Sequence, residues 1–242
     1  MTEQKQNAAE KQALFWIPPP LAVELGSQLA SWAQSQSSIL QTQLELVRQQ
    51  IGMEYGVPVP QVELRGATDL SANSYRIFVY ANEVAHGDIL FDHLLAIHKE
   101  KGTPLIDGIE ALDPVGGATA YWISSASQER AVSAGYRVVD AASVLATHLG
   151  RVVKEHLERF IGLQETQALL DALRDTSPAV VASVEKTQLD LVDVYNVLKA
   201  LLKDRVPIRD LPLILTVLAD HGRHTTEIDL LVRQVRQALR YR

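Results

Sequence analysis

The chain has 242 residues, a formal net charge of −6 and no cysteine. Its 47% of hydrophobic and 21% of charged residues are typical of a packed globular protein and exclude a disordered chain. The acidic balance disfavours nonspecific nucleic-acid binding, and the lack of cysteine excludes disulfides, thiolate metal sites and a cysteine nucleophile.

No run approaches the roughly 18 apolar residues that a membrane helix needs, and the polar residues 1–12 contain no apolar signal core. We therefore expect the chain as it stands to be soluble and to carry no export signal, although it could be the soluble part of a larger membrane protein. We interpret residues 1–17 as a linker. Its apolar end, Leu14, Phe15, Trp16 and Ile17, is followed by three prolines, which force an extended backbone. This quartet either anchors the linker on a domain of this molecule or a neighbour, or forms an edge strand on its own domain.

The next part of the chain alternates between strand and helix patterns. Strands are predicted over residues 21–26, 62–65, 75–80 and 84–90, and helical spacing runs from Ser27 to Gly52. Phe78 and Tyr80 share one strand face, which we expect to point into the core rather than to form a stacking platform for RNA. Strand, helix and further strands together predict an α+β unit.

A loop with strong breakers covers residues 112–117, and Gly116-Gly117 indicates a tight turn that needs positive φ. A strand over 118–123, a short helix over 127–134 and a strand over 136–139 follow. Asp140 is the expected N-cap of a helix that runs to about Phe160.

Residues after Gly162 show only helical patterns. Helices are expected over 164–174, 191–203 with Asp190 as N-cap, 210–219 and 227–240 with Thr226 as N-cap. The predicted fold class is therefore α+β followed by an all-helical module.

Few residues suggest chemistry. His221 and His224 lie at a predicted helix end without a carboxylate at a ligand interval, and Ser124-Ser125 matches no hydrolase motif. Gly116-Gly117 lacks the Gly-Lys-Ser/Thr of a phosphate loop. We expect no metal, no cofactor, no small-molecule substrate and no enzymatic activity. A hydrolase whose residues meet only in space and a nucleic-acid-binding module remain as alternatives.

Eight segments, in this order, carry a more specific signal. They are Pro20–Gly26, Ser74–Ile77, Glu83–Gly87, Ala120–Ile123, Gly135–Asp140, Val144–Leu149, Gln164–Leu170 and Arg205–Leu211. Together they resemble the cytoplasmic region of the large export-gate proteins of flagella and of virulence type III secretion. This is the flagella/hypersensitive-response/invasion proteins export pore family.

The resemblance implies an architecture and a place in the cell. A first α+β subdomain, residues 18–91 and 141–160, would be interrupted by a small α/β subdomain, residues 92–140, that is ferredoxin-like or RNA-recognition-like. A helical subdomain, residues 161–242, would follow. The family's membrane domain and fourth subdomain are absent from this chain, which would be an excised piece, a reading-frame fragment or a free-standing relative. We expect it in the bacterial cytoplasm, at the cytoplasmic face of the inner membrane.

The resemblance also implies partners. The family platform binds export chaperone–substrate complexes, a gatekeeper protein and the stalk of the export ATPase, and it forms a cyclic ring, nine copies by family analogy. In flagellar members, residues that match Asp113 and Thr147 lie around the chaperone cleft. The aromatic residue of that cleft falls at Gly116 here, which favours a virulence member over the flagellar alternative.

The segment Arg205-Val206-Pro207-Ile208-Arg209-Asp210 has two interpretations. Pro207 makes the connection rigid, which is typical of a structural hinge between two helices. Alternatively, Arg205 and Arg209 present charge to a neighbouring subunit. With Leu14, Phe15, Trp16 and Ile17, they are our candidates for the ring interface.

Overall fold

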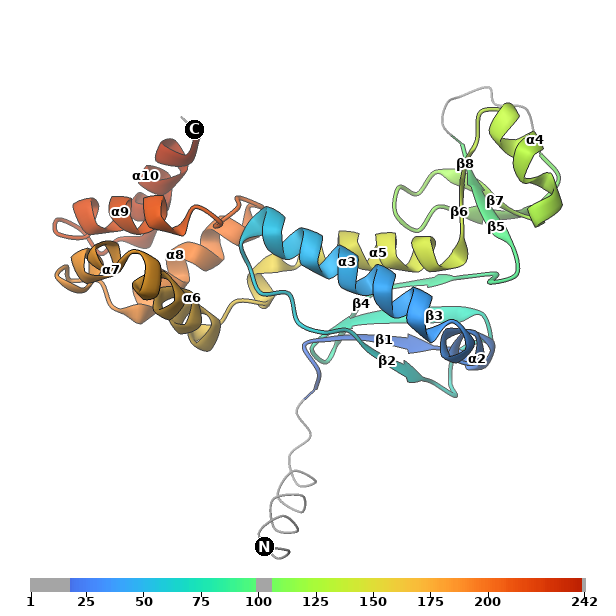
Figure 1. Ribbon diagram of the computed structural model, residues 1–242, viewed down its shortest axis with the longest axis horizontal. Coiled ribbons are helices and arrows are strands. Elements are labelled where there is room, and N and C mark those ends of the chain that lie inside the picture. Colours follow the sequence, from blue (N-terminus) through green and yellow to red (C-terminus); the bar gives the residue numbers. More distant parts are fainter. Residues whose placement is uncertain (1–17, 99–105, 241–242) are drawn as a thin grey trace, which may run out of the picture.

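The computed structural model describes residues 18–98 and 106–240 (Figure 1). The predicted linker, with Leu14, Phe15, Trp16 and Ile17, lies outside the described residues. Two four-stranded sheets and a helical C-terminal part follow one another along the chain, which confirms the predicted α+β class. The finer division into subdomains stays a prediction. No helix of the described part is both long and apolar enough to cross a membrane.

The first sheet has the strand order β2-β1-β3-β4. Its strands are β1 (Leu21–Leu25), β2 (Glu63–Gly66), β3 (Ser74–Val79) and β4 (Asn82–Asp88). β1 pairs in parallel with β2 and antiparallel with β3, which pairs antiparallel with β4. The predicted single helix between β1 and β2 is two helices, α2 (Ser27–Ser35) and α3 (Ser37–Tyr55). Serines surround the break, and serine side chains compete with helical backbone hydrogen bonds.

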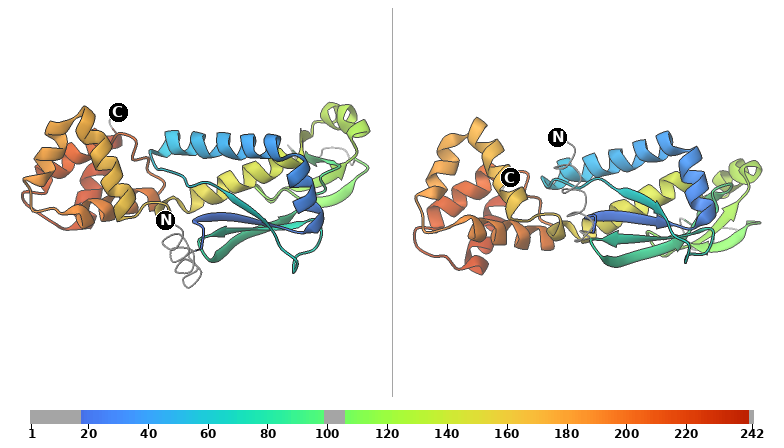
Figure 2. Two further views of the ribbon diagram at one scale, coloured as in Figure 1. Left: turned by 60° about the horizontal axis from the view of Figure 1, so that its bottom comes forward. Right: turned by 90° about the horizontal axis from the view of Figure 1, so that it is seen from below.

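The direction of the β3 side chains differs from the prediction. Ile77 and Val79 are fully buried, whereas Phe78 is half-buried and Tyr80 is exposed, so the expected core-facing position of the two aromatic residues was wrong. Helices α3 and α5 cover the face of the first sheet that carries Ile77 and Val79 (Figures 1 and 2), so these two β-branched side chains lie in the core.

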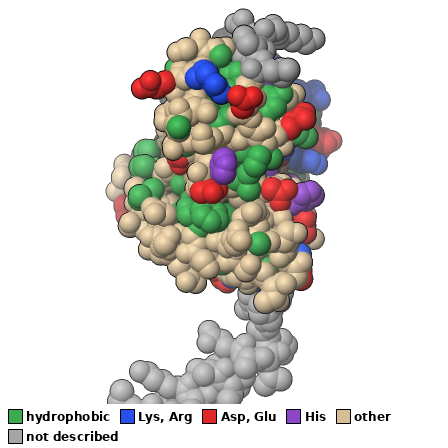
Figure 3. All heavy atoms as spheres, turned by 90° about the vertical axis from the view of Figure 1, so that its right-hand side faces the viewer, with side chains coloured by type: hydrophobic (Ala, Val, Ile, Leu, Met, Phe, Trp, Pro, Cys, Tyr) green, Lys and Arg blue, Asp and Glu red, His purple; other side chains and the backbone are tan. Residues whose placement is uncertain are grey.

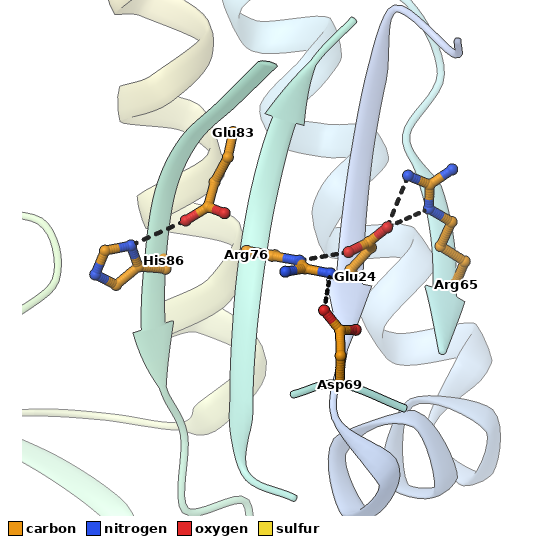
Figure 4. Close-up of polar contacts among 6 residues, drawn as sticks. All are labelled: Glu24, Arg65, Asp69, Arg76, Glu83 and His86. Carbon is orange, nitrogen blue, oxygen red and sulfur yellow. Dashed lines mark hydrogen bonds and ion pairs between the residues drawn. The ribbon is translucent and has the colours of Figure 1, made fainter. Parts of the chain in front are cut away.

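Outward-facing Phe78 is covered by two guanidinium groups instead. Arg65 and Arg76 lie 5.8 Å and 5.5 Å from its ring centre. Both arginines form ion pairs with Glu24, and Arg76 also pairs with Asp69 (Figure 4). The outer face therefore carries alternating charges rather than a basic stripe.

The second sheet has the order β6-β7-β5-β8. Its strands are β5 (Leu94–Ile97), β6 (Ile109–Leu112), β7 (Thr119–Ile123) and β8 (Arg137–Val139), and α4 (Gln128–Ser133) covers it with a small separate core. The sequence predicted β7, α4 and β8 but missed β5 and β6. β5 is too short and too uniformly apolar to show alternation, and β6 is exposed at the sheet edge.

Helix α5 (Ala141–Glu155) joins the second sheet back to the first. As predicted, Asp140 is its N-cap, because Oδ1 accepts a hydrogen bond of 2.9 Å from the Ser143 amide. The helix ends at Glu155, before the expected Phe160, and a short 3-10 turn, η2 (Leu157–Arg159), follows. A Cβ on Gly150 would lie 2.8 Å from Val47 Cγ1, so this glycine allows α5 to pack closely on α3.

The helical part contains α6 (Leu163–Thr176), α7 (Pro178–Glu185), α8 (Leu191–Lys203), α9 (Leu211–His221) and α10 (Ile228–Arg240). Asp190 caps α8 as predicted. Asp210 is the N-cap of α9 rather than a residue of its first turn. α7 was not predicted, because Pro178 was interpreted as a break although proline is favoured at the first helical position.

Candidate docking site between α3, α5 and the loop 113–117

An open depression of about 410 Å³ lies where α3 and α5 cross. We call it the docking depression. Its lining residues are Val47, Gln50, Ile51, Glu54, Val115, Thr147, Gly150, Arg151, Lys154, Glu155 and Arg205. They come from α3, from α5, from the loop that joins β6 to β7, and from the connection between α8 and α9. The depression thus brings together two helices, a loop of the second sheet and a connection of the helical part.

The loop 113–117 is held by the side chain of Asp113. Its carboxylate accepts hydrogen bonds from the amides of Val115 (3.0 Å) and Gly116 (3.1 Å), and only 6% of the residue is exposed. A Cβ on Gly116 would lie 3.0 Å from Oδ2 of Asp113, whereas Gly117 has the predicted positive φ of +67°. Asp113 therefore positions the loop and does not itself line the docking depression.

Thr147 and the loop lie at the same depression. Thr147 is exposed on α5, and its hydroxyl donates a hydrogen bond of 2.7 Å to the Ser143 carbonyl oxygen. One turn later, the guanidinium of Arg151 donates to the carbonyl oxygen of Val115 and so joins α5 to the loop. Sequence reasoning missed Arg151, although its i, i+4 spacing from Thr147 places both on one helix face.

Charged groups of both signs surround an apolar floor. Val47, Ile51 and Gly150 form the floor, while Lys154 pairs with Glu54 at 2.7 Å across the two helices. The exposed Arg205, which adopts a positive φ of 58°, also lines the depression. An apolar floor with a charged rim can bind protein side chains, because burying apolar surface on the floor stabilises the complex and the charged rim fixes the partner's orientation.

Arg209 lies outside the docking depression. It lines a second depression, next to α10, and its side chain is exposed. The preceding residue, Ile208, is buried, and its amide donates a hydrogen bond of 2.7 Å to the Tyr55 carbonyl oxygen at the end of α3. The connection between α8 and α9 is therefore bound to α3, while both of its arginines face solvent.

Beneath α5, His148 and Tyr75 form a buried pair. The Tyr75 hydroxyl and His148 Nδ1 share a hydrogen bond of 2.7 Å, and His148 is only 3% exposed. Burial, followed by the charge of Arg151, lowers the pKa of His148 from 6.5 to about 4, and burial raises the pKa of Tyr75. At neutral pH the imidazole is uncharged and serves packing.

The other candidate histidines do not converge. In residues 18–98 and 106–240, no group of three or more His, Cys, Asp or Glu side chains could hold a metal ion. Figure 3 shows the face formed by α2, the second sheet and α4, where acidic, histidine and hydrophobic side chains are interspersed without a dominant basic patch.

A family model described as the FHIPEP family matches residues 1–242. The chain belongs to this family. The resemblance drawn from the eight segments is confirmed, and with it the assignment to the export gates of flagellar and type III secretion systems. This FHIPEP member is 40% identical over 221 residues to the flagellar biosynthesis protein FlhA of Bacillus subtilis; the match covers 91% of the chain and 33% of that relative. The chain spans about a third of the length of such curated relatives.

Solved structures share the fold at lower identity. The structure of the Chlamydia pneumoniae CdsV and CdsO protein complex matches with a TM-score of 0.81 and 21% identity, over 93% of this chain and 71% of that one. The nonameric EscV cytosolic domain from the type III secretion system matches with a TM-score of 0.68 and 23% identity, over 93% and 65%. These similarities show the fold of the FHIPEP member.

Proposed function

We propose that this FHIPEP member is a docking platform of an export gate, which binds export chaperone–substrate complexes and a gatekeeper protein without catalysing a reaction. The docking depression is the observation that carries this proposal. It has an apolar floor, a charged rim and an open mouth, and it is built from four separate segments of the chain. Such a surface suits recognition of a folded protein partner.

The proposed setting is the bacterial cytoplasm, at the cytoplasmic face of the inner membrane, with copies arranged in a ring. The nonameric assembly of the EscV cytosolic domain supports a ring. The complex of CdsV with CdsO supports a further protein partner, for which we propose the stalk of the export ATPase. Arg205 and Arg209, both exposed, remain candidates for the charged part of the ring contact.

The comparisons favour the flagellar alternative over the virulence system that Gly116 suggested. Identity to the flagellar relative of Bacillus subtilis is 40%, against 23% to the EscV domain of the type III secretion system. We therefore propose that flagellar chaperone–substrate complexes bind more tightly than those of a virulence system. The nucleic-acid alternative loses support, because Arg65 and Arg76 beside Phe78 are already paired with carboxylates.

A pair of matched threonine substitutions tests the proposal. Thr147→Met fills the mouth of the docking depression and is expected to weaken binding of a flagellar chaperone–substrate complex about tenfold or more in calorimetric titrations. Thr216→Met is the control, because Thr216 is also exposed on a helix and donates a 2.7 Å hydrogen bond four residues back, to Pro212. Equal affinities for both variants and the parent chain would refute the proposed site.

A further inference from the structure

Strand β4 forms one margin of the first sheet, and in the described part of the chain no strand pairs with its outer edge (Figure 4). Just beyond β4, the amide of Ile89 donates a hydrogen bond of 2.9 Å to the carbonyl oxygen of Asn73. Hydrogen-bonded and non-hydrogen-bonded residue pairs alternate along an antiparallel ladder. Gly87 and Ala85 therefore turn their backbone groups toward β3, and His86 and Asp88 turn theirs outward.

A groove runs along this free edge. It has a volume of about 450 Å³ and contains four consecutive β4 residues, Glu83, Val84, Ala85 and His86. Its opposite wall consists of Pro114, from the loop 113–117, together with His148 and Arg151 from α5. One wall is thus the edge of a strand and the other is mainly a helix. Domains that bind peptides by strand addition use such an edge, because it satisfies the peptide backbone.

We propose that this β4 groove binds an extended peptide segment of a chaperone–substrate complex, which adds to the first sheet as a fifth strand. The inference rests on the proposed function, because the same partner would occupy the docking depression. The two sites are neighbours: Arg151 lines both, and the loop 113–117 lies between them, with Val115 lining the docking depression and Pro114 lining the β4 groove.

The groove defines the chemistry of the peptide. Side chains alternate along a strand, so every second side chain of the bound peptide lies on the same side as Ala85 and Gly87. Small or apolar peptide side chains fit there, beside Pro114 and His148. The remaining side chains lie on the side of His86 and Asp88. β4 carries Glu83 and Asp88 but neither lysine nor arginine, which favours basic residues there.

The β-bulge in β4 limits the length of regular pairing. The register shifts between Ile77 and Phe78, which leaves Val84 unpaired, and the regular stretch runs from Ala85 to Asp88. Gly87 is required in this stretch, since a Cβ there would lie 2.7 Å from the Tyr75 hydroxyl oxygen. A short segment with alternating apolar and basic residues is therefore the expected ligand.

A pair of probe peptides tests backbone recognition on the parent chain. The first is a fluorescein-labelled six-residue peptide of alternating lysine and valine, and the second carries N-methyl groups on the amides of both its lysines and its valines, so that no amide can donate in either strand direction. Both have the same charge, so attraction to the acidic chain is common to them. We expect the methylated peptide to bind about tenfold or more weakly by fluorescence anisotropy, because its amides cannot donate to the strand edge. Equal binding of both peptides would overturn the proposal.

Two variants of His86 give an independent test. His86→Ala removes the imidazole and keeps the outward N–H, whereas His86→Pro removes both. We expect the proline variant to lose about tenfold more affinity for the unmethylated peptide than the alanine variant. If the proline variant does not fold, the peptide pair on the parent chain decides. Failure of strand addition while Thr147→Met still weakens complex binding would overturn this inference alone and leave the proposed function standing.

Discussion

The buried Tyr75–His148 pair connects β3 to α5 directly beneath the β4 groove. Its imidazole stays neutral because charging it would require a proton inside the core, which is why its pKa falls to about 4. The sequence could not identify Tyr75 as the partner of His148, because 73 residues separate the two positions.

A pH dependence of stability follows from this pair. Between pH 6.5 and 4 the unfolded chain binds a proton at His148 that the folded chain does not bind, so the free energy of unfolding falls as pH falls through this window. The contribution is roughly 1 kcal/mol per pH unit. His148→Gln should be less stable at pH 7 by about 1–3 kcal/mol, since the bond to Tyr75 is weakened, but should lose less on acidification. Urea titrations from pH 7 to 4 measure both quantities; parallel pH profiles for the two proteins would contradict this role.

The loop 113–117 shows how far single residues could be predicted. The turn, its positive φ and the polar Asp113 were all evident from the sequence. The direction of the Asp113 side chain was not, because a carboxylate before a tight turn can cap its own loop or face a partner, and only the fold decides. Gly116 likewise has a local reason, the nearby Asp113 carboxylate, besides any role in a cleft.

At the scale of elements, periodicity predicted what was long or strictly alternating. α8 and β3 were predicted nearly to their ends, and α5 was predicted from its N-cap onward, because their apolar spacing and caps agree. β5, β6 and α7 were missed, since each is short and its pattern depends on which neighbour covers it. The contact between α3 and the connection 206–209 could not be predicted from the sequence either. In the structure, Gly56 is the C-cap of α3 and adopts a left-handed conformation with a φ of +75°.

Gly56 provides a prediction for this junction. A Cβ there would lie 2.5 Å from the backbone of Arg209, in addition to the strain of a left-handed conformation. Gly56→Ala should lower the free energy of unfolding by about 3 kcal/mol. Gly117→Ala is the matched control: its φ is +67° but no atom lies within 4 Å of the added Cβ, so it should cost about 1 kcal/mol. If both variants lose the same free energy of unfolding in thermal or urea titrations, the close contact between Gly56 and the connection 206–209 does not contribute to stability.

At the scale of the whole molecule, the family resemblance predicted more than the patterns did. The order of the eight segments indicated a gate protein, whereas composition and charge only excluded other classes. Neither could locate the β4 groove, because its walls, β4 and α5, lie about 60 residues apart and meet only through the fold.

Assembly is the prediction that belongs to this scale. A ring contact that normally forms between tethered copies can be small and polar, so the isolated chain should be monomeric when dilute and should associate at high concentration and low salt. Arg209→Glu should weaken this association, and Arg223→Glu, an equal change of charge at an exposed residue, should weaken it less. Sedimentation velocity over a concentration series measures both. A tight dimer that is insensitive to salt would contradict a ring, because a closed twofold contact leaves no head-to-tail surface.

Hydrogen–deuterium exchange of the chain with and without a flagellar chaperone–substrate complex tests the central claim most directly. The docking depression predicts slower exchange in residues 47–54, 113–117 and 147–155 when the complex is bound. Strand addition would extend this protection to residues 84–88. Binding that leaves all of these segments unchanged and protects only the helical part from α6 to α10 would contradict the account.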